Sequence, residues 1–102
     1  MGTCLVRVIA RKVLVDFARR HPDAKGHLES WWLLLKKADW AAPQDVKNAL
    51  PKASIVANNR VVFDICGGSY RLIVKFNYPY RIGYIRFIGT HSEYDKIDVT
   101  TI

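Results

Sequence analysis

The sequence predicts a single α+β domain in which helices lie on one face of an antiparallel sheet. The first half of the chain spaces its apolar residues as helices do, whereas the second half changes to the period of two that is typical of strands. Short turn signals separate the strand-like runs, and such short links favour antiparallel neighbours. A chain of 102 residues has room for one core, so we expect one domain over residues 1–102.

The predicted elements of the first half are one strand, two longer helices and a further short helix. Leu5–Ala10 is rich in β-branched residues and predicts a short strand. Lys12–Arg20 predicts a helix, and Pro22 interrupts it. Asp23 is expected to cap a second helix over about 24–38. The apolar stripe of that helix consists of Leu28, Trp31, Trp32 and Leu35. Residues 42–45 predict a turn and a further short helix.

The second half predicts four strands joined by three hairpin-like links. The expected strands are Ser54–Ala57, Val61–Cys66, Ser69–Phe76 and Arg81–Ile88. The links are Asn58-Asn59, Gly67-Gly68 and the longer turn over 77–80. Thr90 followed by Glu93 forms a capping-box pattern, which predicts a short C-terminal helix. The prediction is therefore a sheet of about four to five strands, with two N-terminal helices packed on one face.

Composition restricts the partners and the cellular compartment. The 16 Lys and Arg against 9 Asp and Glu give a net charge of +7 and an isoelectric point of about 9.7. Such a field attracts nucleic acid, although an acidic protein or an anionic membrane would feel it too. No run approaches the roughly 20 apolar residues of a membrane span, so we expect no membrane association. Neither Cys4 nor Cys66 lies in a C-x-x-C pair, so we expect no metal site and a reduced, cytoplasmic protein.

Cations alternate with apolar residues on two of the predicted strands. The period of two places Arg71, Ile73 and Lys75 on one face, and the core positions on the other are Tyr70, Leu72, Val74 and Phe76. On the last strand, Arg86 is expected to share a face with Ile82, Tyr84 and Ile88. A cation there must reach solvent, a carboxylate or a phosphate, because burying it unpaired is costly. A salt-bridged arginine at the sheet edge is the alternative interpretation.

The residues that follow the last strand suit metal-free cleavage of RNA. That reaction needs a group that removes the proton of the 2′-hydroxyl, an acid for the leaving oxygen, and cations that steady the phosphate. His91 can act as acid or base near neutral pH, Tyr94 can stack on a base or transfer a proton, and Asp95 can orient His91. The helical spacing puts all three on one face. A capping histidine and a packing tyrosine are the alternative.

These segments together resemble the HigB family of type II toxins. The similar stretches are Lys37–Trp40, Asn59–Phe63, Tyr70–Val74 and, most specifically, the run Tyr84–Asp98. The resemblance implies the fold of the RelE group of ribonucleases. It also implies ribosome-dependent cleavage of messenger RNA that inhibits translation and needs no metal or other cofactor. The implied partner is a HigA-type antitoxin with a helix-turn-helix domain, and operator DNA is reached only through the antitoxin complex.

The resemblance also assigns roles to single residues. Arg71, Arg86, His91, Tyr94 and Asp95 match the family pattern and are the predicted catalytic residues. Lys75 stands at a position that is usually basic in the family, and we predict it as RNA-binding. We add Arg81 and Arg60 as two further predicted RNA-binding residues.

One stretch departs from the family pattern. The family commonly has amides and a lysine where this chain has Asp64, Gly68 and Ser69. Asp64 adds negative charge where RNA is expected to pass. Two alternatives to a full ribonuclease therefore stay open. One is a weakened toxin homologue that binds antitoxin or RNA for regulation, and the other is a basic adaptor for an acidic protein.

Overall fold

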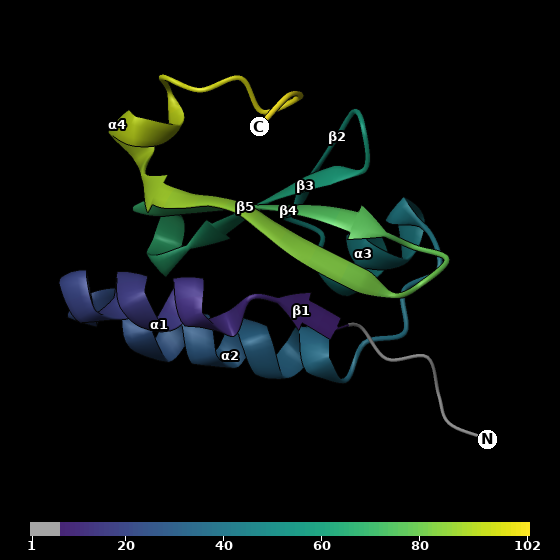
Figure 1. Cartoon of the computed structure of the whole chain (residues 1–102), viewed down its shortest axis with the longest axis horizontal. Coiled ribbons are helices and arrows are strands. Elements are labelled where there is room, and N and C mark those ends of the chain that lie inside the picture. The colour runs from purple at the N-terminus through teal and green to yellow at the C-terminus, as the bar shows by residue number, and fades with distance from the viewer. Residues whose placement is uncertain (1–6) are drawn as a thin grey trace.

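The computed structural model describes residues 7–102 and contains a five-stranded mixed sheet (Figure 1). The strands are β1 (Arg7–Ile9), β2 (Ser54–Val56), β3 (Arg60–Ile65), β4 (Tyr70–Asn77) and β5 (Ile82–Thr90). Their order across the sheet is β1-β5-β4-β3-β2. Strands β2 to β5 form the predicted antiparallel meander, and β1 adds a parallel edge next to β5. Leu5 and Val6 of the predicted first strand, and Cys4, lie outside the described residues.

The helices divide between the two faces of this sheet. They are α1 (Arg11–Arg20), α2 (Lys25–Lys36), α3 (Pro43–Ala49) and α4 (His91–Tyr94), with short 3-10 turns η1 (Pro22–Ala24) and η2 (Cys66–Gly68). Figure 1 shows α1 and α2 side by side under one face, and α4 on the opposite side. The predicted α+β fold is confirmed. No helix within residues 7–102 has the length and apolar character needed to cross a membrane.

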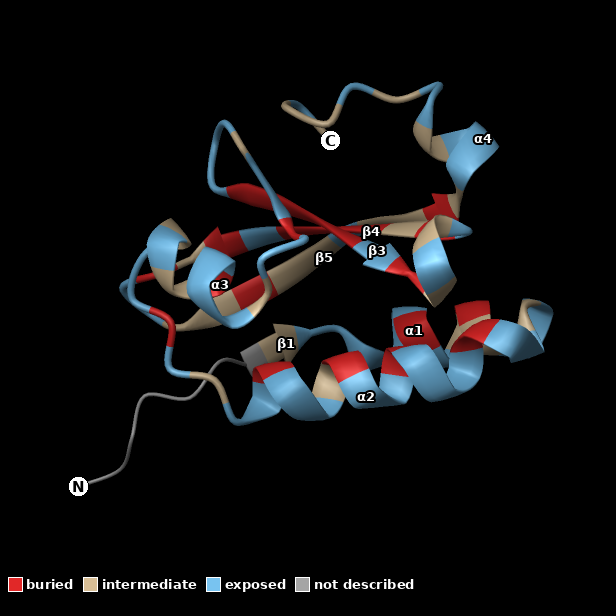
Figure 2. Ribbon diagram, turned by 180° about the vertical axis from the view of Figure 1, so that it is seen from behind, coloured by how far each residue is buried: buried red, intermediate tan, exposed pale blue. Residues whose placement is uncertain are grey.

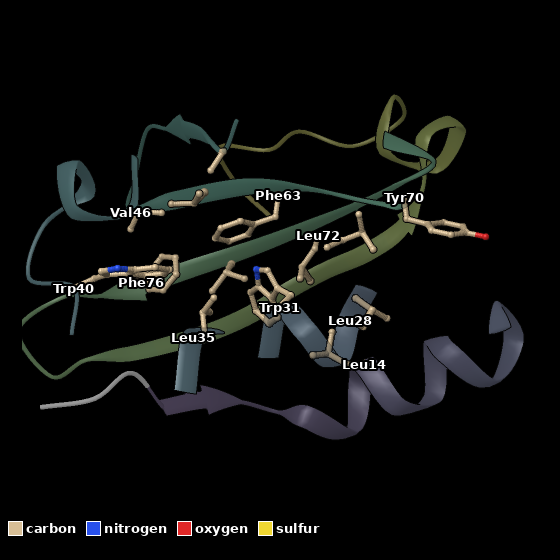
Figure 3. Packing of buried hydrophobic residues seen from close by; sticks show 14 of the residues in the cluster. Leu14, Leu28, Trp31, Leu35, Trp40, Val46, Phe63, Tyr70, Leu72 and Phe76 are labelled. Carbon is tan, nitrogen blue, oxygen red and sulfur yellow. The ribbon is translucent and has the colours of Figure 1, made fainter. Parts of the chain in front are cut away.

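The core lies between the sheet and the pair α1–α2. Figure 2 shows buried residues on the strands and on the helix surfaces that face them. In Figure 3, Leu28, Trp31 and Leu35 of α2 point toward Phe63, Leu72 and Phe76 of the sheet. The rings of Trp31 and Phe63 meet edge to face with centroids 5.3 Å apart. The predicted stripe of α2 is thus buried, except that Trp32 is only half-buried.

Asp23 does not cap α2, contrary to the expectation from the sequence. The N-cap residue is Ala24, and no side chain bonds to the first turn. Instead, Asp23 lies inside η1 and its carboxylate accepts the hydrogen bond of the Tyr70 hydroxyl at 2.8 Å. This hydrogen bond raises the pKa of Tyr70. The contact ties the junction between α1 and α2 to the start of β4.

The strand β5 differs from its prediction at two points. Arg81 does not belong to the strand, because it adopts a positive φ of 55° in the preceding turn. A β-bulge also shifts the register between β4 and β5: Ile73 faces Phe87, but Val74 faces Ile85. Arg86 is the extra residue of this bulge and has no partner in the β4–β5 register. Such an extra residue interrupts the alternation of side chains between the two faces. Arg86 therefore does not share a face with Ile88, which packs against the core.

Candidate functional site

The site lies on the face of the sheet that turns away from α1 and α2, which we call the open face. Three rows of paired residues cross it from β3 through β4 to β5: Asp64, Arg71 and Gly89; Val62, Ile73 and Phe87; Arg60, Lys75 and Tyr84. The first row lies next to α4 (Figure 1). Val62 and Ile73 are nevertheless buried, and the chain after α4 runs back over this side of the sheet. An apolar row thus separates two polar ones.

Arg71 in the first row is held from three sides. Its Nε lies 3.2 Å from Oδ1 of Asp64, its partner across the sheet. Its Nη1 donates to the carbonyl oxygen of Gly68. Its guanidinium carbon lies 5.7 Å from the ring centroid of Tyr94, which is a cation–π distance. Only 17% of the Arg71 side chain is exposed, so these three contacts fix its orientation.

His91 and Asp95 form a pair on the exposed surface of α4. Nδ1 of His91 lies 3.1 Å from Oδ2 of Asp95, and both side chains are more than half exposed. This contact leaves Nε2 as the nitrogen available to a substrate. Asp95 therefore takes the orienting position that the sequence predicts, and such a carboxylate fixes the ring and favours a proton on Nδ1. His91 is also tied to the β3–β4 connection, because its backbone N–H donates to the carbonyl oxygen of Ser69 at 3.2 Å.

The predicted capping box positions this pair. Thr90 Oγ1 accepts from the backbone N–H of Glu93 at 3.2 Å, and Glu93 Oε1 accepts from the backbone N–H of Thr90 at 2.8 Å. These bonds to Thr90 lower the pKa of Glu93. Gly89 leaves room for the arrangement, because a Cβ there would lie 2.7 Å from the Phe87 ring and 3.0 Å from the Glu93 carboxylate. The start of α4 is therefore rigidly joined to β5.

Lys75 and Arg86 line a hollow of about 500 Å³ further along the open face. Tyr84 forms part of its wall, and Tyr78 is buried beneath it. Burial raises the pKa of Tyr78 to about 12, so this residue stays a neutral phenol. Both cations are exposed, and within residues 7–102 neither has an acidic partner. They are free to bind an anion that enters the hollow.

The cations are spread along the strand direction and do not meet at one point. Arg71 and Lys75 are four residues apart on β4, which corresponds to roughly 13 Å. The bulge places Arg86 beside the segment between them, opposite Ile73 and Val74. This spacing suits an extended polyanion better than a single small phosphate.

Arg60 and Arg81 are not part of this arrangement. Arg60 is only 7% exposed, and its Nε donates to the carbonyl oxygen of Ile102 at 2.9 Å, which fastens the C-terminal segment. Arg81 lies in the turn at the other end of β5, where its Nε lies 2.8 Å from Asp39. Their donors are engaged within the protein, so the geometry gives no support for their predicted RNA-binding role, and we leave them out of the site.

Sequence reasoning placed Tyr84 on the same face as Arg86 but assigned no role in the site to Tyr84 or Gly89. Tyr84 faces Lys75 across the strands and lines the same hollow as Arg86. The signal in the sequence was that Tyr84 and Arg86 are two residues apart on one strand, which places them on the same face. The role of Gly89 could not be found in this way, because it depends on how closely Phe87 and Glu93 approach. In the described part of the chain, no group of three His, Cys, Asp or Glu side chains is placed to hold a metal ion.

A second surface feature is an apolar groove of about 330 Å³ between α1 and α2. We call it the helix groove; its lining residues are Arg11, Leu14, Val15, Ala18, Arg19, Pro22, Lys25, Leu28, Glu29 and Trp32. Trp32 lies under two cations, with Arg11 at 4.2 Å and Lys36 at 4.8 Å from its ring centroid. The groove thus combines an apolar floor with a mainly cationic rim.

The fold and the open face define the chain as a small basic α+β domain whose sheet presents Arg71, Lys75 and Arg86 beside a His–Asp pair. The sequence model of the HigB toxin family, described as the RelE-like toxic component of a toxin-antitoxin system, matches residues 24–97. The chain therefore belongs to the HigB family. This confirms the family that the resemblance indicated, and the mixed sheet with its short C-terminal helix is consistent with a RelE-like fold.

Similar curated proteins agree with this family. An mRNA interferase HigB from Escherichia coli O6:H1 (strain CFT073) is 26% identical over 94 residues, which cover 90% of this chain and 91% of the relative. The mRNA interferase toxin HigB of Escherichia coli strain K12 is 26% identical over 92 residues, and the match covers 88% of each chain. An mRNA interferase HigB from Shigella flexneri matches over the same extent with the same identity.

Proposed function

We propose that this chain is an mRNA interferase, an endoribonuclease that cleaves messenger RNA and thereby inhibits translation. The observation that carries the proposal is the His91–Asp95 pair at 3.1 Å, at the end of a sheet face that also presents Arg71, Lys75 and Arg86. Membership of the HigB family supports the same activity.

The proposed reaction is attack of a ribose 2′-hydroxyl on the adjacent phosphorus. The 2′ O–P bond forms, the bond to the 5′ oxygen of the next nucleotide breaks, and protons leave the first oxygen and reach the second. His91 transfers a proton through Nε2, while Asp95 holds its ring. Arg71, Lys75 and Arg86 bind phosphate oxygens and stabilise the charge of the transition state. Tyr94, placed beside Arg71, stacks on a base or takes part in proton transfer.

We further propose that the substrate is mRNA on the translating ribosome, in the cytoplasm. The cations of the open face are spread apart along the strands, so a ribosome that holds the RNA against this face would compensate for weak binding of free RNA. The test is to compare cleavage of one mRNA by the purified protein, free and on stalled ribosomes. We expect cleavage of the ribosome-bound message to be at least tenfold faster. Equal rates would remove the ribosome from the proposal, and no cleavage in either state would remove the activity.

The proposed partner is a HigA-type antitoxin that carries the helix-turn-helix domain and brings the complex to operator DNA. Membership of a toxin-antitoxin family supports an antitoxin partner. The helix groove offers it a docking surface, because its floor is apolar and Arg11, Arg19 and Lys25 contribute to its rim. An acidic amphipathic helix of the antitoxin complements both properties.

A weakened toxin homologue that acts as a regulatory binding module is the second candidate. The observation that favours it is the pairing of Asp64 with Arg71, which engages one of the three phosphate-binding cations. This candidate predicts antitoxin binding without RNA cleavage. The comparison of free and ribosome-bound mRNA separates it from the enzyme, because it predicts no new RNA ends in either state.

A further inference from the structure

Asp64 faces Arg71 directly across the β3–β4 pair, on the surface that is proposed to bind RNA. Oδ1 of Asp64 lies 3.2 Å from Nε of Arg71, and half of the Asp64 side chain is exposed. A carboxylate at this position repels a phosphate that approaches the same guanidinium. The contact therefore bears on RNA binding as well as on the stability of the sheet.

The guanidinium of an arginine binds a phosphate best through two parallel N–H donors. One such fork consists of Nε and Nη2, and the other of Nη1 and Nη2. In this protein Asp64 engages Nε, and the Gly68 carbonyl oxygen accepts from Nη1. The Nε/Nη2 fork depends on the one N–H of Nε, which faces Asp64, whereas Nη1 carries two N–H groups and gives one of them to Gly68. A phosphate can therefore occupy the Nε/Nη2 fork only if it displaces Asp64.

Of the two groups that contact the guanidinium, the Asp64 carboxylate is the one that water or a phosphate can replace. Asp64 is half exposed, and an ion pair with such exposure is only weakly stabilising. The Gly68 carbonyl belongs to η2, whose backbone is fixed by the hairpin. The pairing of Asp64 is thus weak enough to be displaced and strong enough to reduce binding.

We infer that Asp64 is an internal competitor of phosphate for Arg71 and lowers the affinity of this chain for RNA. The inference rests on the proposed function, since it concerns the same open face. It also gives a physical meaning to the departure at position 64. An uncharged amide there would place a neutral oxygen near Nε and would not repel phosphate. Asp64 thus determines how much of the affinity for RNA Arg71 contributes and how much depends on Lys75 and Arg86.

The test is the affinity for a single-stranded RNA oligonucleotide with 2′-O-methyl riboses, which cannot be cleaved. We compare wild type, Asp64→Asn and Asp16→Asn at several salt concentrations. Asp16 is the matched control, because it pairs with Arg19 at 3.9 Å on α1 and its substitution changes the net charge equally. Asp64→Asn is expected to bind roughly two- to tenfold more tightly, with a steeper salt dependence because one further phosphate is bound. Asp16→Asn is expected to change the affinity less than twofold.

Further variants separate the possible failures. In an Arg71→Ala background the gain from Asp64→Asn should disappear, and the charge-preserving Asp64→Glu should show no gain. Asp64→Ser replaces Asp64→Asn if the latter does not fold. An affinity equal to that of Asp16→Asn, or a weaker one, overturns the inference alone. If neither protein binds free RNA, cleavage of ribosome-bound mRNA decides: equal rates for wild type and Asp64→Asn overturn the inference alone, and no cleavage by either protein overturns the proposed function and the inference with it.

Discussion

The open face and the helix groove are both cationic, but their cations stand in different surroundings. On the open face, Arg71, Lys75 and Arg86 accompany a His–Asp pair, and the two exposed cations, Lys75 and Arg86, line a hollow. In the helix groove, the cations surround an apolar floor that includes Trp32. Net charge alone therefore does not distinguish the two surfaces. On the basis of these neighbours we propose that the open face binds RNA and that the helix groove binds an amphipathic protein segment.

This contrast predicts that the two surfaces can be disabled separately. Substitutions on the open face should reduce RNA cleavage and leave antitoxin binding intact, and substitutions in the helix groove should do the reverse. A variant that damages both functions while remaining folded would show that the two surfaces are coupled.

The largest effect is expected from His91→Ala. Loss of a positioned proton-transfer group costs about 100-fold or more in the rate of RNA cleavage. Asp95→Asn keeps the ring contact but not the charge, so a smaller loss is expected. Rates of cleavage of ribosome-bound mRNA measure both effects. Antitoxin affinity, followed by titration calorimetry, should be unchanged in each variant, and full activity of His91→Ala would exclude it as the proton-transfer residue.

Trp32→Ala is expected to weaken antitoxin binding by roughly 30-fold. A tryptophan in an interface commonly contributes 2 kcal/mol or more, and here it also presents its ring to Arg11 and Lys36. Leu33→Ala on the same helix is the matched control, because Leu33 is 48% exposed and does not line the groove. Equal affinities of the two variants would place the docking surface elsewhere.

Arg86→Ala is expected to weaken RNA binding roughly tenfold. Loss of a charged hydrogen bond to phosphate costs about 1.5 to 3 kcal/mol when the contact is well formed, and the exposure of Arg86 favours the lower value. The salt dependence of the affinity should also become less steep, by about 0.7 in the logarithmic slope. Lys52→Ala removes an exposed cation away from the open face and serves as control. A tenfold loss in that variant too would indicate that only the overall charge matters.

The smallest effect concerns pH and the capping box. Because the pKa of Glu93 is lowered in the folded protein, its stabilising contribution is present above its ordinary value of 4.5 and is lost as the pH falls through the folded-state value. Glu93→Gln keeps an acceptor for Thr90 but does not titrate. The melting temperatures of the two proteins should differ most above that ordinary value and converge in acid. A constant difference would contradict the role given to the cap.

The fold was largely predictable because its signals are local. The alternation in Tyr70–Phe76 placed the core side chains of β4 correctly, and the Thr90–Glu93 pattern located the start of α4. The errors at Asp23, Arg81 and Arg86 share one cause. Each depends on a tertiary contact, a turn or a bulge that no spacing in the sequence reports.

The candidate site was only partly predictable. The resemblance to the HigB family supplied Arg71, Arg86, His91, Tyr94 and Asp95, which the structure places on or beside the open face. The engagement of Arg60 by the C-terminal segment was not predictable, because the two groups are 42 residues apart. The pairing of Asp64 with Arg71 depends on the register that η2 imposes on β3 and β4.

The most direct test of the central claim is induction of the His91→Ala, Arg86→Ala double variant in growing cells, beside wild type. Growth and the positions of new RNA 5′ ends are the measured quantities, and recovery of a folded double variant bound to antitoxin is the control. We predict that wild type arrests growth and creates new 5′ ends within messages, whereas the folded double variant does neither. Undiminished toxicity with the same 5′ ends in the double variant would contradict the site assigned to the open face.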